Sequence, residues 1–172
     1  MSSGRSRAPL TFLPEDAPFR YESDEPGREL ADRTLDTGSD EPDRAVRVGQ
    51  GGYAVAEDVV LATDNLFSCV GVVAYDAERQ RGLVSHVDYR SVQERDPVEE
   101  LYEAFGRGSL EVALVLGPEP MDAILEPIEE RLQDAPEGIE VDDVETVYAG
   151  LEGSAGGVAL EVDGSLSRYR RD

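Results

Sequence analysis

One short segment, residues 61 to 87, contains three side-chain types that thiol chemistry uses. Cys69 is the only cysteine of the chain, His86 is its only histidine, and Thr63 lies six residues before the cysteine. A cysteine is an intrinsic nucleophile, a histidine accepts and returns a proton near neutral pH, and a hydroxyl can hold the imidazole in one tautomer. These residue types indicate nucleophilic catalysis by a thiol.

Each of the three residues also has a purely structural interpretation. A lone cysteine beside a run of valines is more often a small core residue, and a histidine within Leu-Val-Ser-His-Val is more often half-buried in a strand. A threonine is common in turns and strands. From spacing alone, the structural interpretation is the favoured one.

The scarcity of cysteine and histidine also bears on metals and cross-links. A single cysteine cannot form an internal disulfide, and one histidine without a pair of cysteines gives no zinc-ligand pattern. We therefore expect no structural metal and no cofactor.

The elements around these residues predict a hairpin. Cys69 begins the apolar run Cys69–Tyr75, and His86 lies near the end of the second arm, Gly82–Val87. Antiparallel pairing of the two arms places Cys69 and His86 near the same edge of a sheet. The first arm is apolar throughout, which is typical of a strand buried on both faces.

The rest of the chain predicts an α+β or layered α/β domain: a sandwich of mixed or antiparallel β-sheet with two main helices packed on it. One helix begins after Asp96, since Pro97 and Glu99 follow at capping positions. The second spans residues 121–132, where Pro127 should kink or divide it. The other predicted strands are Ala45–Val48, Tyr53–Ala56, Val59–Ala62, Leu110–Leu116, Ile139–Val141, Thr146–Ala149, Gly157–Val162 and Leu166–Tyr169, the last two joined by a tight turn at Asp163-Gly164.

Composition divides the chain in two. Residues 1–44 are acidic and show neither a helical nor an alternating apolar period, so we predict a mostly disordered tail. The alternative is a docking segment built on Phe12 or Phe19. Residues 45–172 contain regularly recurring apolar runs and should form the folded domain.

The charge balance excludes some partners. The chain has 38 acidic and 16 basic residues and a formal charge of -22, so nucleic acid is not an expected partner. All basic residues are arginine, and this acidic, lysine-free composition resembles that of halophilic proteins, for which we expect stability and activity to rise with salt. The sequence has no apolar stretch long enough to cross a bilayer and no secretory signal, so we expect a cytoplasmic protein without membrane insertion.

Several segments, in order, resemble the chemoreceptor glutamine deamidase family CheD over residues 46 to 170. His86 follows Cys69 by seventeen residues, as in that family, and Thr63 precedes the cysteine at the family spacing. The chain departs from the family in two places, where Asn65-Leu66-Phe67 replaces Gly-Leu-Gly and His86-Val87-Asp88-Tyr89-Arg90 replaces His-x-Met-Leu-Pro. The other matching segments are Gly51-Gly52-Tyr53-Ala54-Val55, Phe67-Ser68-Cys69-Val70, Leu116-Gly117-Pro118-Glu119-Pro120-Met121, Gly153-Ser154-Ala155-Gly156-Gly157 and the hairpin around Asp163-Gly164.

The resemblance implies a hydrolase that converts specific chemoreceptor glutamines to glutamate in chemotaxis adaptation, a protein-glutamine glutaminase. Cys69 would be the nucleophile, His86 the base and then the acid, and Thr63 the residue that orients His86 or the substrate. The implied partners are chemoreceptor cytoplasmic helices and a CheC-type phosphatase.

Two other interpretations stay open: a catalytically degenerate CheD-like adaptor that binds the same partners, and a halophilic domain whose triad is coincidental. A catalytic Cys69 should be alkylated faster than a denatured thiol, and a structural one more slowly. We also expect the carboxylates of Asp64, Asp76 and Asp88 to disfavour the thiolate.

Overall fold

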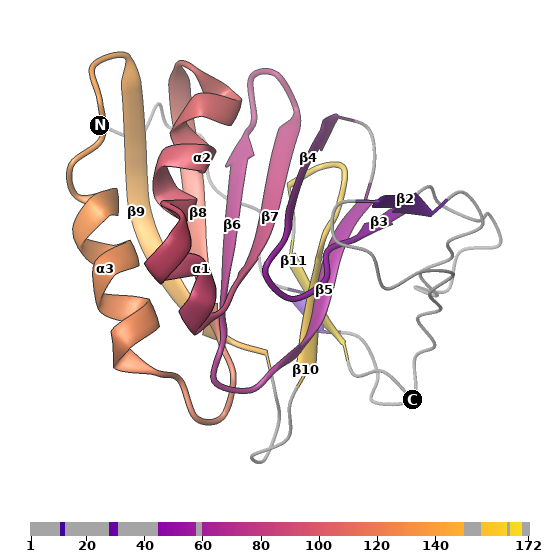
Figure 1. The fold of residues 1–172 in the computed structure, drawn as a ribbon. Coiled ribbons are helices and arrows are strands. Elements are labelled where there is room, and N and C mark those ends of the chain that lie inside the picture. The colour runs from indigo at the N-terminus through magenta and orange to yellow at the C-terminus, as the bar shows by residue number, and fades with distance from the viewer. Residues whose placement is uncertain are drawn as a thin grey trace, which may run out of the picture.

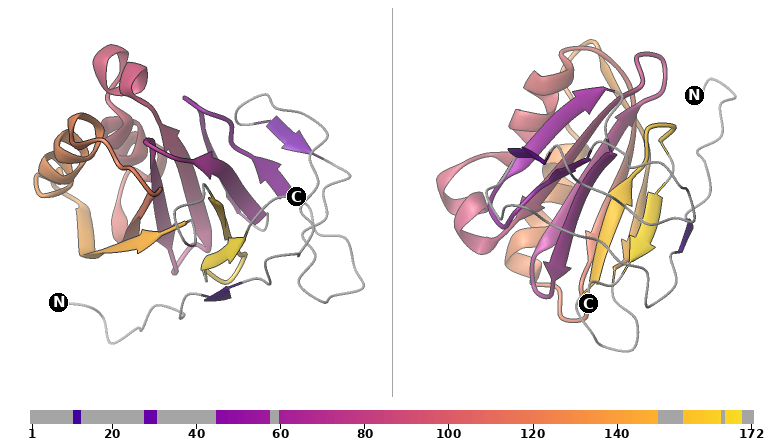
Figure 2. Two further views of the ribbon diagram at one scale, coloured as in Figure 1. Left: turned by 90° about the horizontal axis from the view of Figure 1, so that it is seen from below. Right: turned by 90° about the vertical axis from the view of Figure 1, so that its right-hand side faces the viewer.

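A computed structural model describes residues 11–12, 28–30, 45–57, 60–149, 156–164 and 166–169. Within these residues two β-sheets pack face to face, and three helices cover the outer face of one of them (Figures 1 and 2). The predicted layered α+β sandwich is therefore confirmed. The structure has one short helix in addition to the two that the sequence predicts.

The five-stranded sheet carries the helices and has the order β4-β7-β6-β8-β9. Its strands are β4 (Tyr53–Glu57), β6 (Val70–Asp76), β7 (Arg81–Val87), β8 (Gly108–Leu116) and β9 (Ile139–Tyr148). All neighbours pair antiparallel except β8 and β9, which are parallel. Every residue of the central strand β6 is buried, as the continuous apolar run predicts.

The second sheet has the order β1-β11-β10-β5-β3-β2. Its strands are β1 (Thr11–Phe12), β2 (Arg28–Leu30), β3 (Ala45–Arg47), β5 (Val60–Leu66), β10 (Gly156–Leu160) and β11 (Leu166–Tyr169). Apart from β1 and β2, the predicted tail 1–44 lies outside the described residues, as does most of the glycine-rich segment 153–157.

The helices are α1 (Tyr89–Glu94), α2 (Pro97–Phe105) and α3 (Asp122–Leu132). Helix α2 begins as predicted, because the Asp96 side chain accepts a hydrogen bond from the Glu99 amide at 3.0 Å. Helix α3 runs on through Pro127, so of the two outcomes expected at this proline, a kink or a division, the division is wrong. The proline lies near its middle, where it removes one backbone donor without ending the helix.

Two apolar clusters form the core, one on each face of the five-stranded sheet. On the outer face, strand residues such as Val72 and Leu114 pack against Leu101 and Ile128 of the helices. On the inner face, Val73 and its neighbours pack in a cluster that includes residues of the second sheet. Any side chain of β6 or β7 therefore faces either the helices or the second sheet.

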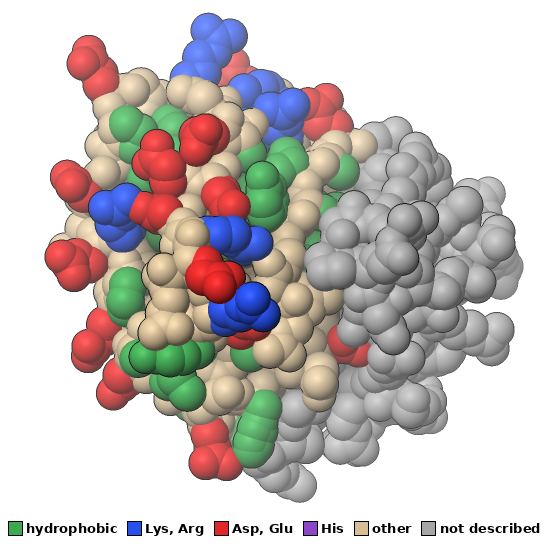
Figure 3. Space-filling model, viewed as in Figure 1, with side chains coloured by type: hydrophobic (Ala, Val, Ile, Leu, Met, Phe, Trp, Pro, Cys, Tyr) green, Lys and Arg blue, Asp and Glu red, His purple; other side chains and the backbone are tan. Residues whose placement is uncertain are grey.

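Acidic side chains are spread over the helical face of the molecule, around a few arginines (Figure 3). This distribution agrees with the acidic composition of the chain. In the part of the chain that the structure describes, no helix has both the length and the apolar character that a membrane crossing needs.

Candidate functional site

The structure joins His86 of β7 to Thr63 of β5 by a hydrogen bond between the two sheets. His86 Nδ1 lies 2.8 Å from Thr63 Oγ1, and the two side chains are 2% and 0% exposed. The same hydroxyl donates to the carbonyl oxygen of Val48 at 2.7 Å. A hydroxyl has one hydrogen, so it accepts from His86 and Nδ1 carries the proton. In the neutral ring the basic lone pair is therefore on Nε2.

The backbone of residues 48–52 holds this arrangement from the side of β4. The Gly51 amide donates to the His86 carbonyl at 2.8 Å, and the His86 amide donates to the Gly52 carbonyl at 2.9 Å. Gly51 has a φ of +84°, a left-handed conformation that favours glycine. The Val48 carbonyl that orients the hydroxyl thus belongs to a segment bound directly to the histidine strand.

Cys69 lies beside His86 at the end of the predicted hairpin. In the ladder Val70 pairs with Val87 and Gly71 pairs with His86. Cys69 belongs to the core cluster between the sheets, whereas Val70 and Val87 belong to the cluster under the helices. Cys69 is a bend residue one step outside the ladder, and it lies on the same side of the sheet as His86.

Gly71 leaves space for Val115 and Leu66 at this point. It stands directly opposite His86 and has no side chain. An added Cβ would lie 3.2 Å from Val115 Cβ and 3.4 Å from Leu66 Cδ1, so the site is tight even without one. The three predicted site residues thus gather at one end of the β6–β7 hairpin, with Thr63 reaching them from the other sheet.

The thiol of Cys69 is neutral in this environment. Burial, and secondly the charge of Asp88, raise its pKa from the ordinary value of 9.0 to about 11. Asp88 is one of the three carboxylates expected to disfavour the thiolate. Asp76 is instead bonded to Arg79 at 2.6 Å, at the far end of β6. The site therefore holds a protonated thiol, and ionising it needs an acceptor for the proton.

Asp88 has a larger part in the site than its sequence position suggests. It is the N-cap of α1, and its carboxylate accepts hydrogen bonds from the Ser91 amide at 2.8 Å, the Ser91 hydroxyl at 2.6 Å and the Gln50 side-chain amide at 3.1 Å. Burial acts to raise its pKa, but these bonds and the charge of His86 outweigh burial and lower it. Asp followed three residues later by Ser is a capping pattern, so the sequence did carry a signal for α1.

A second loop fixes the segment that carries Cys69. The amides of Glu119 and Met121 donate to the carbonyls of Phe67 and Ser68, each at 3.2 Å. At Gly117 the two backbones touch, and a Cβ there would overlap the carbonyl oxygen of Leu66. The segment after β8, which the sequence comparison with CheD singles out, therefore packs directly on the loop before the cysteine.

Replacing Gly117 with alanine should displace this loop, since backbone cannot yield as a flexible side chain does. We expect Gly117→Ala to lower the thermal midpoint by several degrees and to change the alkylation rate of Cys69. Gly106→Ala is the control, because Gly106 has a φ of +72° but nothing within 4 Å of an added Cβ. Gly117 itself has no left-handed φ, so equal effects of the two variants on stability and on Cys69 alkylation would contradict the role of the contact between the loops.

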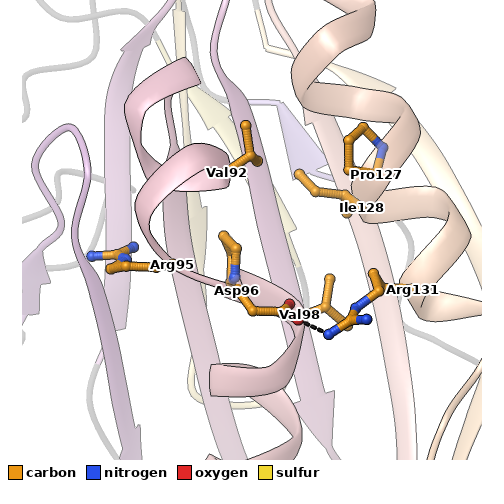
Figure 4. A pocket seen from close by; sticks show the side chains of 8 residues that line it. Val92, Arg95, Asp96, Val98, Pro127, Ile128 and Arg131 are labelled. Atoms are coloured by element: carbon orange, nitrogen blue, oxygen red, sulfur yellow. Dashed lines mark ion pairs between the residues drawn. The ribbon is translucent and has the colours of Figure 1, made fainter.

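A separate pocket of about 230 Å³ lies between α1, α2 and α3 (Figure 4). An ion pair between Asp96 and Arg131 crosses it, and apolar side chains such as Val92 and Ile128 complete its wall. It lies on the helical side of the five-stranded sheet, whereas Thr63 and His86 meet on the inner side. The pocket is therefore not part of the thiol site.

No group of three or more His, Cys, Asp or Glu side chains among the described residues could hold a metal ion. No family model matches the chain, and no curated protein matches it. Among solved structures, the hypothetical protein YfiH of Bacillus licheniformis aligns with 16% identity and a TM-score of 0.35, over 76% of this chain. The chain spans 64% of the length of that protein. The resemblance to CheD rests on the sequence motifs alone.

Proposed function

We propose that this protein is a cysteine-dependent protein-glutamine deamidase that acts on chemoreceptors. The observation that supports this most is the chain of hydrogen bonds from His86 Nδ1 through Thr63 Oγ1 to the Val48 carbonyl. It leaves Nε2 as the basic nitrogen of a buried imidazole beside the only cysteine of the chain.

In the proposed reaction, Nε2 of His86 takes the proton of the Cys69 thiol as sulfur attacks the carboxamide carbon of a glutamine. The carbon–nitrogen bond then breaks, and the imidazolium gives its proton to the departing nitrogen, which leaves as ammonia. Water loses a proton to Nε2 and attacks the thioester, and the thiol is restored. The products are a glutamate side chain and one ammonia per glutamine.

The charges of Asp88 and of protonated His86 are consistent with a Cys69 thiol that loses its proton only as it attacks the substrate. Asp88 opposes a resting thiolate, yet its charge and that of a protonated His86 attract each other. The same carboxylate therefore favours the imidazolium that forms when the proton moves. His86 acts in this scheme as a general base toward a neutral thiol, and no stable thiolate–imidazolium pair is needed. Alkylation of the resting thiol is then slow even in an active enzyme, so the expectation that a catalytic Cys69 reacts faster than a denatured thiol does not hold for this site.

The deciding experiment is ammonia release from a purified chemoreceptor cytoplasmic domain in concentrated KCl, with converted glutamines mapped by mass spectrometry. Cys69→Ala should abolish release, and His86→Ala should lower it by about 10²- to 10⁴-fold. For the wild type the rate should rise with KCl. Release that survives Cys69→Ala would refute the proposal, and a rate that falls with KCl would refute the halophilic interpretation.

A second candidate is an adaptor that keeps the CheD-like fold without turnover. The raised pKa of Cys69 and its exposure of only 8% favour this function. It predicts no ammonia release from any receptor, together with binding to the receptor domain or a CheC-type phosphatase that Cys69→Ala leaves unchanged. Binding measured by calorimetry alongside ammonia release separates the two functions.

A further inference from the structure

Gln50 places a carboxamide against Asp88, the carboxylate whose charge acts on the Cys69 thiol. It is exposed and lies in the segment 48–52 that binds His86. Its side-chain nitrogen donates to Asp88 Oδ2 at 3.1 Å. The ladder between β6 and β7 ends at the pair Val70 and Val87. Cys69 is the residue before Val70, and Asp88 is the residue after Val87. The thiol and the carboxylate therefore belong to residues at the same end of the hairpin, one position beyond the last pair.

Hydrogen bonds hold the backbone on both sides of Gln50, and before it the Val48 amide donates to the Ala62 carbonyl at 2.7 Å. The amide of the next residue, Gly51, is bonded to His86, and the Gly51 carbonyl accepts from Arg95 Nη1 at 2.7 Å. The exposed Gln50 side chain, in contrast, is held at its end by the bond to Asp88. It can leave by rotation about its own bonds without moving the segment that positions Val48 and His86.

We propose that Gln50 is an internal pseudosubstrate whose carboxamide covers the entrance to Cys69 and must swing away before a substrate glutamine binds. This inference rests on the proposed function, because Gln50 presents the same functional group that the deamidase would attack. An incoming carboxamide can replace it with little net cost, since Asp88 then accepts an N–H from the substrate in place of one from Gln50. Asp88 becomes the residue that recognises the amide nitrogen of the substrate.

The proposal predicts that removing the Gln50 side chain opens the site. Iodoacetamide is the probe, since it is small and reacts with the thiolate of Cys69 whether or not the protein is a deamidase. In the full chain, Gln50→Ala should be alkylated about tenfold faster than wild type, as expected when the accessible state changes from a minor to a major population. Gln93→Ala, which removes an exposed glutamine of α1, should react at the wild-type rate.

The pH profile distinguishes an opened entrance from an altered thiol. Opening raises the rate constant of the ionised thiol, which sets the plateau of the profile at high pH. It should also lower the midpoint, because burial is the main cause of the raised pKa of Cys69. A plateau equal to that of the wild type would overturn the proposal, because a faster rate would then come from the shifted midpoint alone. Gln50→Ser provides the same test if Gln50→Ala lacks the native circular dichroism spectrum.

Failure of this inference and failure of the deamidase proposal give different results. Faster alkylation of Gln50→Ala without ammonia release from any variant would support shielding of the thiol by Gln50 and refute the deamidase. Ammonia release by the wild type, with unchanged alkylation and unchanged KM in Gln50→Ala, would support the deamidase and refute the pseudosubstrate.

Discussion

Thr63→Val should lower ammonia release by about 10²- to 10⁴-fold, whereas Thr63→Ser should retain most of the activity. Valine has nearly the shape of threonine, so the buried position stays filled. It cannot accept from His86 Nδ1 or donate to the Val48 carbonyl, which are 2.8 and 2.7 Å from the hydroxyl oxygen. The imidazole is then free to carry its proton on Nε2, the tautomer that cannot take a proton from the thiol. The loss should appear in kcat.

Stability must be measured with the same variant, because its buried groups lose a partner. An unsatisfied buried carbonyl or N–H costs about 1–3 kcal/mol, so the thermal midpoint of Thr63→Val should fall. Rates are therefore compared in KCl at a temperature where circular dichroism shows the native fold. A Thr63→Val enzyme within twofold of the wild-type kcat would mean that the hydroxyl does not set the tautomer.

The sequence predicts the parts of the fold that local patterns define. The hairpin from Val70 to Val87 forms in the expected register, which brings Cys69 next to His86. Helix α2 begins where Asp96 and Pro97 indicate. The local sequence marks where these elements begin and end, through capping residues and the limits of the apolar runs. They can therefore be predicted without knowing which elements they pack against.

Polar residues inside strands cause two of the errors in strand boundaries. The sequence predicts that this strand ends at Ala62, but β5 continues to Leu66, because pairing with β10 resumes at Leu66 after a bulge at Asp64 and Asn65. Two strands were expected between residues 139 and 149, where the structure has the single strand β9, paired with β8 along its length with one register shift. Pairing with a neighbouring strand outweighs the local pattern in both cases.

The chemistry of the site depends on contacts that cross between elements. Thr63 reaches His86 from the other sheet, and its hydrogen goes to Val48, fifteen residues earlier. No periodicity relates these positions, so sequence spacing could suggest the residues but not the direction of the hydrogen bonds. From the sequence, Asp88 is only a departure from the family pattern and a charge near the cysteine. Its bonds to Ser91 and Gln50 need the start of α1, a helix of six residues that is too short for an apolar period.

The second large effect concerns the resting thiol. Iodoacetamide should alkylate native Cys69 about 100-fold more slowly at pH 8 than it alkylates the denatured chain, since a pKa of about 11 leaves about a hundredth of the thiolate that a pKa of 9.0 gives. The native rate should rise about tenfold per pH unit until the pH approaches 11. Restricted access would lower the rate at every pH without moving the midpoint, so the midpoint is the quantity to measure. A native midpoint near 9 would contradict the assigned environment.

Asp88→Asn should change alkylation and catalysis in opposite directions. Removing the charge that opposes the thiolate lowers the pKa of Cys69, so alkylation at pH 8 should become faster, although burial keeps it slower than in the denatured chain. Asparagine still caps a helix well and can accept from the Ser91 amide, which limits the structural cost. Ammonia release should become slower, because the imidazolium of His86 loses the carboxylate that stabilises it. If both rates rose together, attack would begin from a preformed thiolate and His86 would not be its base.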